Sequence, residues 1–376
     1  MAQLGVGIIG CGNISTTYLS LSPLFGSLKL VAVADINASA AQARAAEYGL
    51  RADTVDGLLA ATDVDVVVNL TVPAVHYQVT KAILLAGKHA YSEKPVVLSL
   101  EEGQSLIDIA AARGLRVGSA PDTFLGGAHQ LARAAIDDGR LGRIIGGTAH
   151  VMSHGMEHWH PNPDFFFQPG GGPILDLGPY YLSNLIQLLG PVRSVAALAN
   201  ASFATRTITN GARNGQTVPV DTPTNIHALL EFANGATVTL GASWDVWTHR
   251  HANMELYGET GSLFVPDPNF FGGTVELAGT DGVVTALPVT DHPFYVDNQG
   301  AKGARRANYR AAGLADMAQA IDQGRAHRCN LDLAVHAVDV MTSILRSGAE
   351  RRFITLATTC DRPAALSPDQ ARALLA

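Results

Sequence analysis

A glycine-rich turn at residues 10–15 (GCGNIS) constrains the fold more than any other feature of this 376-residue chain. The turn follows an apolar run at residues 6–9, which is typical of a buried parallel strand, and precedes a helical segment. Gly10 permits the positive φ angle that a tight strand-to-helix turn requires. Gly12 lets the backbone approach a pyrophosphate, and the small Ser15 stands where this motif has its third glycine. We therefore predict a dinucleotide-binding βαβ unit here.

Strands and helices alternate from this turn to about Gly118. Apolar, β-branched runs predict strands, whereas alanine-rich stretches that end in glycine predict helices. The predicted strands cover residues 28–34, 64–70, 89–91 and 115–118, and the predicted helices cover residues 38–48, 75–86 and 100–113. This alternation specifies βαβ units and a parallel, doubly wound sheet.

The pattern changes after Pro121. Period-two alternation predicts strands at residues 226–230, 237–242 and 254–257, and helices are predicted over residues 311–322 and 334–347. Residues 207–223 are rich in Asn, Gly, Thr and Pro and are predicted to form a long surface loop. We therefore predict an α/β protein with an N-terminal Rossmann doubly wound parallel sheet in a domain over residues 1–122. A C-terminal α+β domain with a largely antiparallel open sheet is predicted over residues 123–376.

Composition argues against several classes of protein. The net charge is −7 and 16% of the residues are charged, which argues against nucleic acid or an anionic membrane as the main partner. Three cysteines without a CxxC pair form no disulfide framework and are consistent with a reducing compartment. The chain has neither a secretory leader pattern nor an apolar run of about 18 residues, which a membrane span needs. We expect a cytoplasmic protein.

Asp35 ends the second predicted strand. A carboxylate at this position accepts hydrogen bonds from the adenosine ribose and repels a 2′-phosphate, so we predict NAD rather than NADP as the cofactor. The alternative is that Asp35 caps the next helix. Lys94 follows a later strand, where the carboxyl edge of a parallel sheet faces the ligand crevice. From its position alone, Lys94 is also compatible with an ordinary surface lysine.

Several motifs resemble, in order, those of the glucose–fructose oxidoreductase/inositol dehydrogenase (Gfo/Idh/MocA) family over nearly the whole chain. They are the glycine turn, residues 69–73 (NLTVP) with His76, residues 93–95 (EKP), residues 170–180 (GGGPILDLGPY) and residues 258–262 (GETGS). The resemblance implies that Thr71, Pro73 and His76 lie beside the cofactor and that Glu93 and Lys94 lie at its nicotinamide end. The predicted cofactor-binding set is Gly10, Gly12, Asn13, Ile14, Asp35, Thr71, Pro73, His76, Glu93 and Lys94.

The same resemblance implies the catalytic residues Lys94, Asp176 and Tyr180. Lys94 would reach the reacting hydroxyl, and Asp176 would bind a neighbouring hydroxyl or hold Lys94. Many family members carry a histidine four residues after this aspartate, whereas this chain has Tyr180, which becomes the candidate for proton transfer. A nearby lysine ammonium lowers a phenol pKa from its usual value of about 10. The alternative for Tyr180 and its neighbour Tyr181 is core packing.

An aromatic, histidine-rich segment at residues 154–160 precedes the glycine–aspartate motif. It lacks an accompanying carboxylate or cysteine set, so we predict no metal site. Trp159 is a candidate for stacking on a sugar ring and His160 for binding a hydroxyl, while docking of these rings into the core or a subunit interface remains the alternative. Asp122 is a further candidate for substrate contact.

These residues predict an NAD(P)-dependent oxidoreductase that acts on a sugar or cyclitol, a small-molecule partner. The alternatives are a glycosidase that uses NAD for transient oxidation and a non-catalytic regulator that binds sugar or NAD. Intact Glu93, Lys94 and Asp176 argue against a regulator. Because an open sheet face often associates with a second copy, we expect a homodimer or homotetramer.

Overall fold

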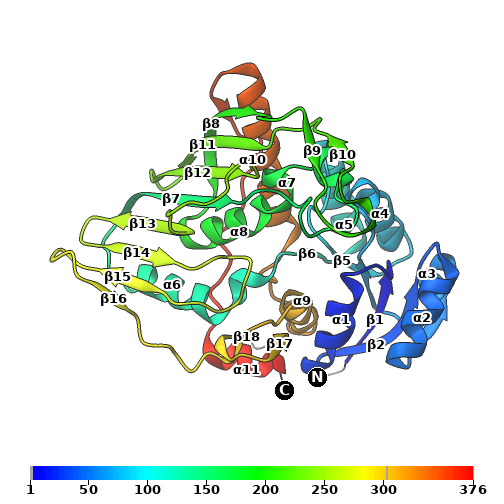
Figure 1. Cartoon of the computed structure of the whole chain (residues 1–376). Helices are drawn as coiled ribbons and strands as arrows, with labels where there is room; N and C mark the ends of the chain where they lie inside the picture. The colour runs from blue at the N-terminus through cyan, green and yellow to red at the C-terminus, as the bar shows by residue number, and fades with distance from the viewer. Residues whose placement is uncertain (1–2, 302–303, 376) are drawn as a thin grey trace. The chain divides into compact units, whose positions relative to one another are not determined.

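The computed structural model describes residues 3–301 and 304–375, and the chain divides into two compact units (Figure 1). The first unit comprises Met1–Gly127, Thr290–Val338 and Pro363–Ala376, and the second comprises Ala128–Val289 and Asp339–Arg362. The first unit thus includes two segments that lie beyond the domain boundary expected at residue 122. Direct contacts explain this: the Ser119 N–H donates to the Cys329 carbonyl at 3.0 Å, and the Gly313 N–H donates to Asp122 at 3.0 Å.

A six-stranded parallel sheet forms the centre of the first unit, which confirms the predicted doubly wound sheet. Its strands are, in spatial order, β3 (Arg51–Asp53), β2 (Leu28–Ala34), β1 (Leu4–Ile9), β4 (Val66–Asn69), β5 (His89–Ser92) and β6 (Val117–Ser119). The chain reverses direction across the sheet between β1 and β4. Ligands of such sheets bind outside the carboxyl ends of the strands at this reversal.

Helices alternate with these strands. They are α1 (Ser15–Leu21), α2 (Ala38–Tyr48), α3 (Val55–Ala60), α4 (His76–Leu85) and α5 (Leu100–Arg113), and α9 (Ala312–Gln323) also belongs to this unit. Side-chain caps fix where they begin: Asn37 accepts from the Ser39 N–H at 3.1 Å, and Ser99 accepts from the Glu102 N–H at 3.2 Å. None of the helices in the described residues is long and apolar enough to cross a membrane.

The second unit contains a nine-stranded sheet in which only the β7–β12 pair is parallel, so the predicted largely antiparallel sheet is confirmed. Its strands are, in spatial order, β16 (Val284–Ala286), β15 (Glu276–Ala278), β14 (Ser262–Val265), β13 (Met254–Gly258), β7 (Ile144–Met152), β12 (Thr237–Ser243), β11 (Asn225–Phe232), β8 (Val192–Asn200) and β19 (Ile354–Thr355). Alternate residues of β11, such as Ile226 and Leu230, are buried, while His227 and Leu229 are exposed. One face of the sheet around β11 is therefore open. The larger helices beside this sheet are α6 (Gly127–Asp137), α8 (Gly178–Leu189) and α10 (Leu331–Glu350).

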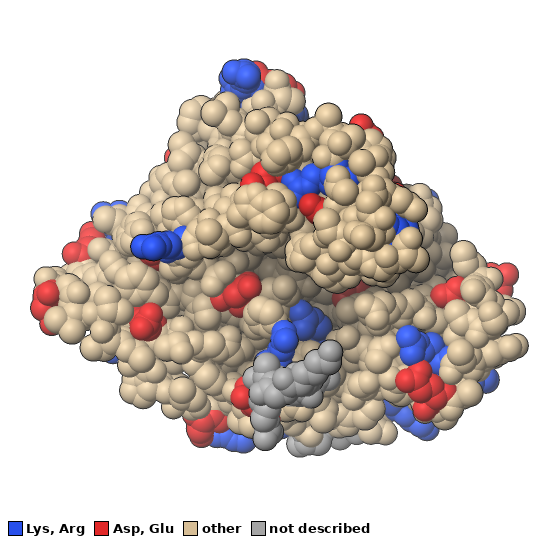
Figure 2. Space-filling model, in the orientation of Figure 1, with Lys and Arg blue, Asp and Glu red and all other residues tan. Residues whose placement is uncertain are grey.

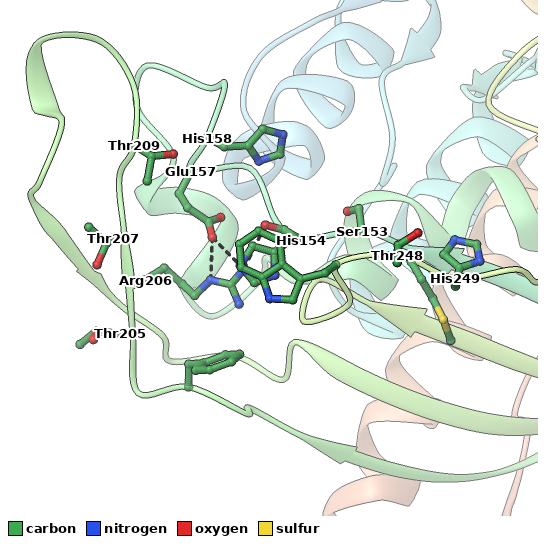
Figure 3. Close-up of a pocket in the computed structure, with 13 residues that line it drawn as sticks. Ser153, His154, Glu157, His158, Thr205, Arg206, Thr207, Thr209, Thr248 and His249 are labelled. Carbon is green, nitrogen blue, oxygen red and sulfur yellow. Dashed lines mark hydrogen bonds and ion pairs between the residues drawn. The ribbon is translucent and has the colours of Figure 1, made fainter.

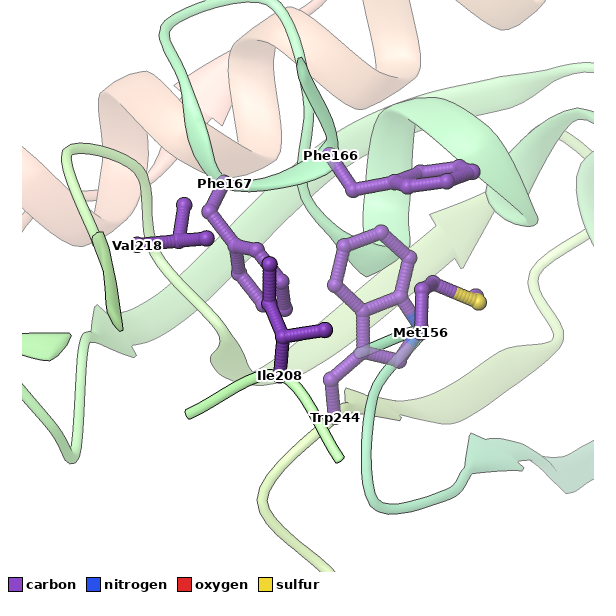
Figure 4. Close-up of a cluster of buried hydrophobic side chains, with 6 residues drawn as sticks. All are labelled: Met156, Phe166, Phe167, Ile208, Val218 and Trp244. Carbon is purple, nitrogen blue, oxygen red and sulfur yellow. The ribbon is translucent and has the colours of Figure 1, made fainter. Parts of the chain in front are cut away.

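The segment at residues 207–223 corrects the prediction of a long surface loop. It contributes to a two-stranded antiparallel hairpin of β9 (Thr205–Thr207) and β10 (Thr217–Pro219). Ile208 and Val218 from this segment are fully buried in an apolar cluster, where they lie beside Trp244 and Phe167 (Figure 4). Burial of these β-branched side chains offsets the turn-forming composition that pointed to a loop.

Candidate functional site

The glycine turn joins β1 to α1 with the geometry that the motif requires. Gly10 has a φ of +104°, and a Cβ there would lie 2.6 Å from the carbonyl carbon of Leu70. A Cβ at Gly12 would meet nothing within 4 Å. The Ser15 hydroxyl donates to the Gly12 carbonyl at 2.6 Å. Gly10 is therefore required by the fold, whereas the space above Gly12 is open to a ligand.

Alanine substitutions separate these two roles. Gly10→Ala is expected to destabilise the protein by more than about 2 kcal/mol, because it combines a positive φ with a backbone clash. Gly12→Ala is expected to leave stability near wild type but to weaken NAD binding about tenfold or more, because its methyl group obstructs close approach of the pyrophosphate. Urea denaturation and NAD titration measure the two effects. Wild-type NAD affinity in Gly12→Ala would contradict this role.

Asp35 ties the end of β2 to the glycine turn. Its Oδ2 accepts from the Cys11 N–H at 2.7 Å, and its Oδ1 accepts from the Asn37 N–H at 2.8 Å. Helix α2 is capped by Asn37, so Asp35 is not the capping residue that the alternative proposed. Burial and the Asp35 carboxylate raise the pKa of the Cys11 thiol to about 11. The next residue, Ile36, is fully exposed.

The loop after β4 is built around Asn69 and His76. Asn69 accepts from the Thr71 hydroxyl at 2.6 Å and donates to the His76 carbonyl at 3.0 Å. The buried His76 ring lies between two carbonyl oxygens, with Nδ1 2.7 Å from that of Pro95 and Nε2 2.9 Å from that of Thr71. His76 thus connects this loop to the segment that carries Lys94. Pro73 begins a short 3₁₀ turn, and contact of Pro73, Thr71 or His76 with the cofactor stays a prediction.

Glu93 and Lys94 directly follow β5, at the same carboxyl edge of the sheet. The Glu93 carboxylate accepts from the Tyr18 hydroxyl at 3.0 Å and from the Lys94 N–H at 3.1 Å. The Lys94–Pro95 peptide bond is cis. Backbone contacts therefore hold Lys94 at the end of β5, beside the loop that His76 joins to it.

Asp176 and Tyr180 belong to the second unit and lie where two helices meet, α7 (Pro173–Asp176) and α8. Gly172, with a φ of +91°, precedes α7, and a Cβ there would lie 2.9 Å from the Pro223 carbonyl oxygen. Tyr181 is buried, and its hydroxyl lies 3.0 Å from Asn253 Nδ2 and 3.4 Å from Asp267 Oδ1. Burial raises the pKa of Tyr181. The alternative of core packing is thus correct for Tyr181, whereas the side chain of Tyr180 is only partly buried.

Asp122 lies in a buried position of the first unit, with 2% of its surface exposed. Its carboxylate accepts from the Gly313 N–H at the start of α9, where no side chain of the preceding residue caps the helix. Burial raises the pKa of Asp122 to about 6. The structure therefore places Asp122 at a helix start, and its contact with substrate stays a prediction.

The aromatic segment keeps Trp159 56% exposed. The Trp159 ring contacts that of His160 edge to face at 5.3 Å, and His160 packs against Phe165 and Phe166 at 5.5 and 5.2 Å. Among the residues that the structure describes, no group of three His, Cys, Asp or Glu side chains gathers as metal ligands. His160 thus supports the loop, and Trp159 retains a free surface.

A cavity of about 920 Å³ in the second unit includes residues that the sequence did not single out (Figure 3). Its buried Arg206 donates to Glu157 and Asp245, each at 2.8 Å. Arg206 directly precedes the segment at residues 207–223 that was predicted to be a loop, and no local pattern marked it as buried. Elsewhere, the face shown in Figure 2 carries scattered acidic and basic side chains rather than a broad basic patch, in keeping with the low charge.

Comparison with known proteins gives consistent matches. The family described as "Oxidoreductase family, NAD-binding Rossmann fold" matches residues 4–120, and the "GFO/IDH/MocA C-terminal domain" matches residues 129–264. Inositol 2-dehydrogenase of Rhizobium meliloti is 25% identical over 93% of this chain and 98% of its own. D-glucoside 3-dehydrogenase of Escherichia coli is 29% identical over 65% of this chain and 71% of its own. The structure of levoglucosan dehydrogenase with NADH and L-sorbose shares the fold, with a TM-score of 0.79, 21% identity, and coverage of 95% of this chain and 100% of that chain.

Proposed function

Because the chain belongs to the Gfo/Idh/MocA family of NAD-binding oxidoreductases, we propose that it transfers hydride between a sugar or cyclitol carbinol and nicotinamide. The observation that carries this proposal is the pair of loops joined by His76, which holds Lys94 at the carboxyl edge of the sheet. The names of inositol 2-dehydrogenase and D-glucoside 3-dehydrogenase support a polyhydroxylated substrate.

The residues of the first unit fit NAD. Open space above Gly12 suits the pyrophosphate, and the Asp35 carboxylate retains lone pairs that can accept from ribose hydroxyls. The fully exposed Ile36 offers an apolar surface for the adenine ring. When bound, NAD supplies the acceptor for the hydride that leaves the carbinol carbon.

Lys94 and Tyr180 handle the hydroxyl proton in this proposal. Oxidation breaks the O–H bond as the C–H bond breaks, so a base must take the proton. Tyr180 Oη takes it as a phenolate, which the Lys94 ammonium stabilises by its charge. Asp176 holds a neighbouring substrate hydroxyl or orients Lys94.

Incubation with NAD and a panel of sugars and cyclitols tests this function. Net formation of NADH, followed by absorbance, is the expected result with at least one member of the panel. Glycoside cleavage without net NADH would favour the NAD-dependent glycosidase instead. Binding of NAD and sugar with neither reaction would contradict an enzymatic role.

Cofactor choice is expected to depend on Asp35. Asp35→Ser removes a carboxylate that accepts from the ribose, so we expect NAD affinity to fall about tenfold and the NAD:NADP ratio of kcat/KM to fall further. Asp63→Ser, which removes an exposed carboxylate elsewhere in the same unit, is the matched control. If both variants keep the wild-type ratio, Asp35 does not select the cofactor.

We also propose that the open sheet face mediates a homodimer or homotetramer. Leu198 on β8 and Leu229 on β11 are exposed on neighbouring strands, where His227 pairs with Leu198 and Leu229 pairs with Ala196. An apolar exposed face favours association with a second copy. Leu229→Glu should shift the mass measured by light scattering toward the monomer, while Val284→Glu on the edge strand β16 should not. An unchanged mass for Leu229→Glu would exclude this face.

A further inference from the structure

Tyr18 connects helix α1 to the segment that carries Lys94. The helix begins at Ser15, directly after the glycine turn, and Tyr18 lies about one turn further along it. The Tyr18 side chain is 1% exposed, and its hydroxyl donates to Glu93 Oε1 at 3.0 Å. The two residues are 75 positions apart in the sequence, so this bond joins two segments that only folding brings together.

The position of the Tyr18 ring does not depend on its hydroxyl. The ring meets that of Tyr91 on β5 edge to face, with the ring centres 6.5 Å apart and the planes inclined at 61°. Tyr91 is fully buried, and an aromatic pair in this arrangement is stabilised beyond the area that it buries. The hydroxyl therefore reaches Glu93 from a fixed direction. Tyr18→Phe would keep this packing and remove only the hydroxyl.

The Glu93 carboxylate forms hydrogen bonds with both of its oxygens. Oε1 accepts from Tyr18, and Oε2 accepts from the Lys94 N–H at 3.1 Å. The Glu93 N–H donates to the Asn69 carbonyl at 2.9 Å, which fixes the backbone from which this side chain extends. A glutamate side chain has several rotatable bonds, and ordering it costs conformational entropy. The bond to Tyr18 therefore helps to keep the second carboxylate oxygen directed at the Lys94 N–H.

The same bond influences the charges around Lys94. A hydrogen bond to a carboxylate is stronger than one between neutral groups. Loss of the Tyr18 hydroxyl would leave Glu93 with an unmet acceptor next in sequence to the Lys94 ammonium, and opposite charges at this range attract. Such an ion pair would compete with the role that the proposed function gives to this ammonium, which is to stabilise the Tyr180 phenolate.

We propose that Tyr18 is a positioning residue for Lys94 and that it acts through Glu93. The inference rests on the proposed function, in which Lys94 serves hydride transfer, and it adds a residue that lies outside the glycine turn and outside residues 93–95. Helix α1 leaves the turn whose open space above Gly12 suits the pyrophosphate. The Tyr18–Glu93 bond therefore connects the orientation of Lys94 to the cofactor-binding part of the first unit.

Steady-state kinetics of the full-length protein, followed by NADH formation, test the proposal. Tyr18→Phe is expected to lower kcat about tenfold, because a misplaced reacting group affects the transition state more than it affects binding. The KM for the substrate and the affinity for NAD should stay within about twofold of wild type. Tyr48→Phe is the matched control: it removes another phenol that bonds to α1, at 3.1 Å from the Ser20 hydroxyl, and should retain the wild-type kcat.

Glu93→Ala distinguishes positioning from packing. If Tyr18 acts through Glu93, the loss of kcat caused by Tyr18→Phe disappears in the Glu93→Ala background, since the shared partner is absent. A purely structural role of Tyr18 would lower kcat by the same factor in both backgrounds, and that result would overturn the proposal. An unchanged kcat in Tyr18→Phe would overturn it as well.

Hydrogen exchange gives a readout that needs no turnover. In the protein without added cofactor, Tyr18→Phe should speed exchange of the Lys94 amide severalfold. The Leu70 amide, which donates to the Ile9 carbonyl at 2.8 Å, should exchange as in wild type. Unchanged exchange at Lys94 would overturn the positioning role. Faster exchange at Lys94, in a protein that forms no NADH with any sugar or cyclitol, would support the Tyr18–Glu93 restraint and contradict the proposed function instead.

Discussion

Replacing Lys94 with alanine is expected to lower kcat/KM by about 10²–10⁴-fold while leaving NAD affinity close to that of the wild type. In the proposed mechanism the Lys94 ammonium stabilises the Tyr180 phenolate, so we expect its removal to leave the substrate hydroxyl without a suitable base. The loop itself should persist, because the substitution retains the Lys94 backbone N–H that donates to Glu93. Steady-state kinetics and NAD titration check the two halves of this expectation.

Matched variants distinguish chemistry from folding. Lys81→Ala changes a lysine on α4 that contacts Tyr77 and should retain full activity. Tyr180→Phe should reproduce most of the loss caused by Lys94→Ala, because it removes the hydroxyl that is proposed to take the proton. Tyr181→Phe removes a buried hydroxyl that meets Asn253 and should cost about 1 kcal/mol of stability with activity preserved. Full turnover in Lys94→Ala would refute the proposed proton path.

The first unit shows how much a sequence pattern can predict. Helix α2 begins and ends where its pattern indicated, because Asn37 caps one end and Gly49, with a φ of +68°, ends the other. The small elements β3 and α3 were not predicted. Strand β3 has three residues and is largely exposed, so it carries no apolar run that would reveal it. Local signals are strong where a cap or a continuous buried strand is present and weak in short surface elements.

Contacts between distant residues account for what the sequence did not reveal. Asp122 bonds to Gly313, and His76 reaches Pro95, so the surroundings of both side chains depend on segments brought together only by folding. The family resemblance implied that His76 lies beside the cofactor, and Asp122 was a candidate for substrate contact, but nothing in the local sequence indicates the backbone partner of either side chain. Lys94, Asp176 and Tyr180 were selected by the family resemblance rather than by their spacing, and their joint role therefore depends on experiment.

Arg206 in the hairpin of β9 and β10 is another residue whose surroundings the local sequence does not reveal. Its substitution has the largest expected effect on stability. Arg206 uses Nε and Nη1 on the carboxylates of Glu157 and Asp245, and Nη2 on the carbonyls of His154 and Trp244. Burial of the Arg206 guanidinium costs free energy, and the bonds to all of these partners together offset that cost. An arginine directly before a Thr-, Asn- and Gly-rich stretch offers no local sign of this burial.

Arg206→Met is therefore expected to lower the free energy of unfolding by about 3–5 kcal/mol, because it leaves two carboxylates buried without a cation. Arg213→Met, which breaks a more exposed pair with Asp164 in the same segment, should cost about 0–1 kcal/mol. Urea denaturation of both variants provides the comparison. Equal losses of unfolding free energy in the two variants would mean that the buried ion pairs of Arg206 stabilise the protein no more than the exposed Arg213–Asp164 pair does.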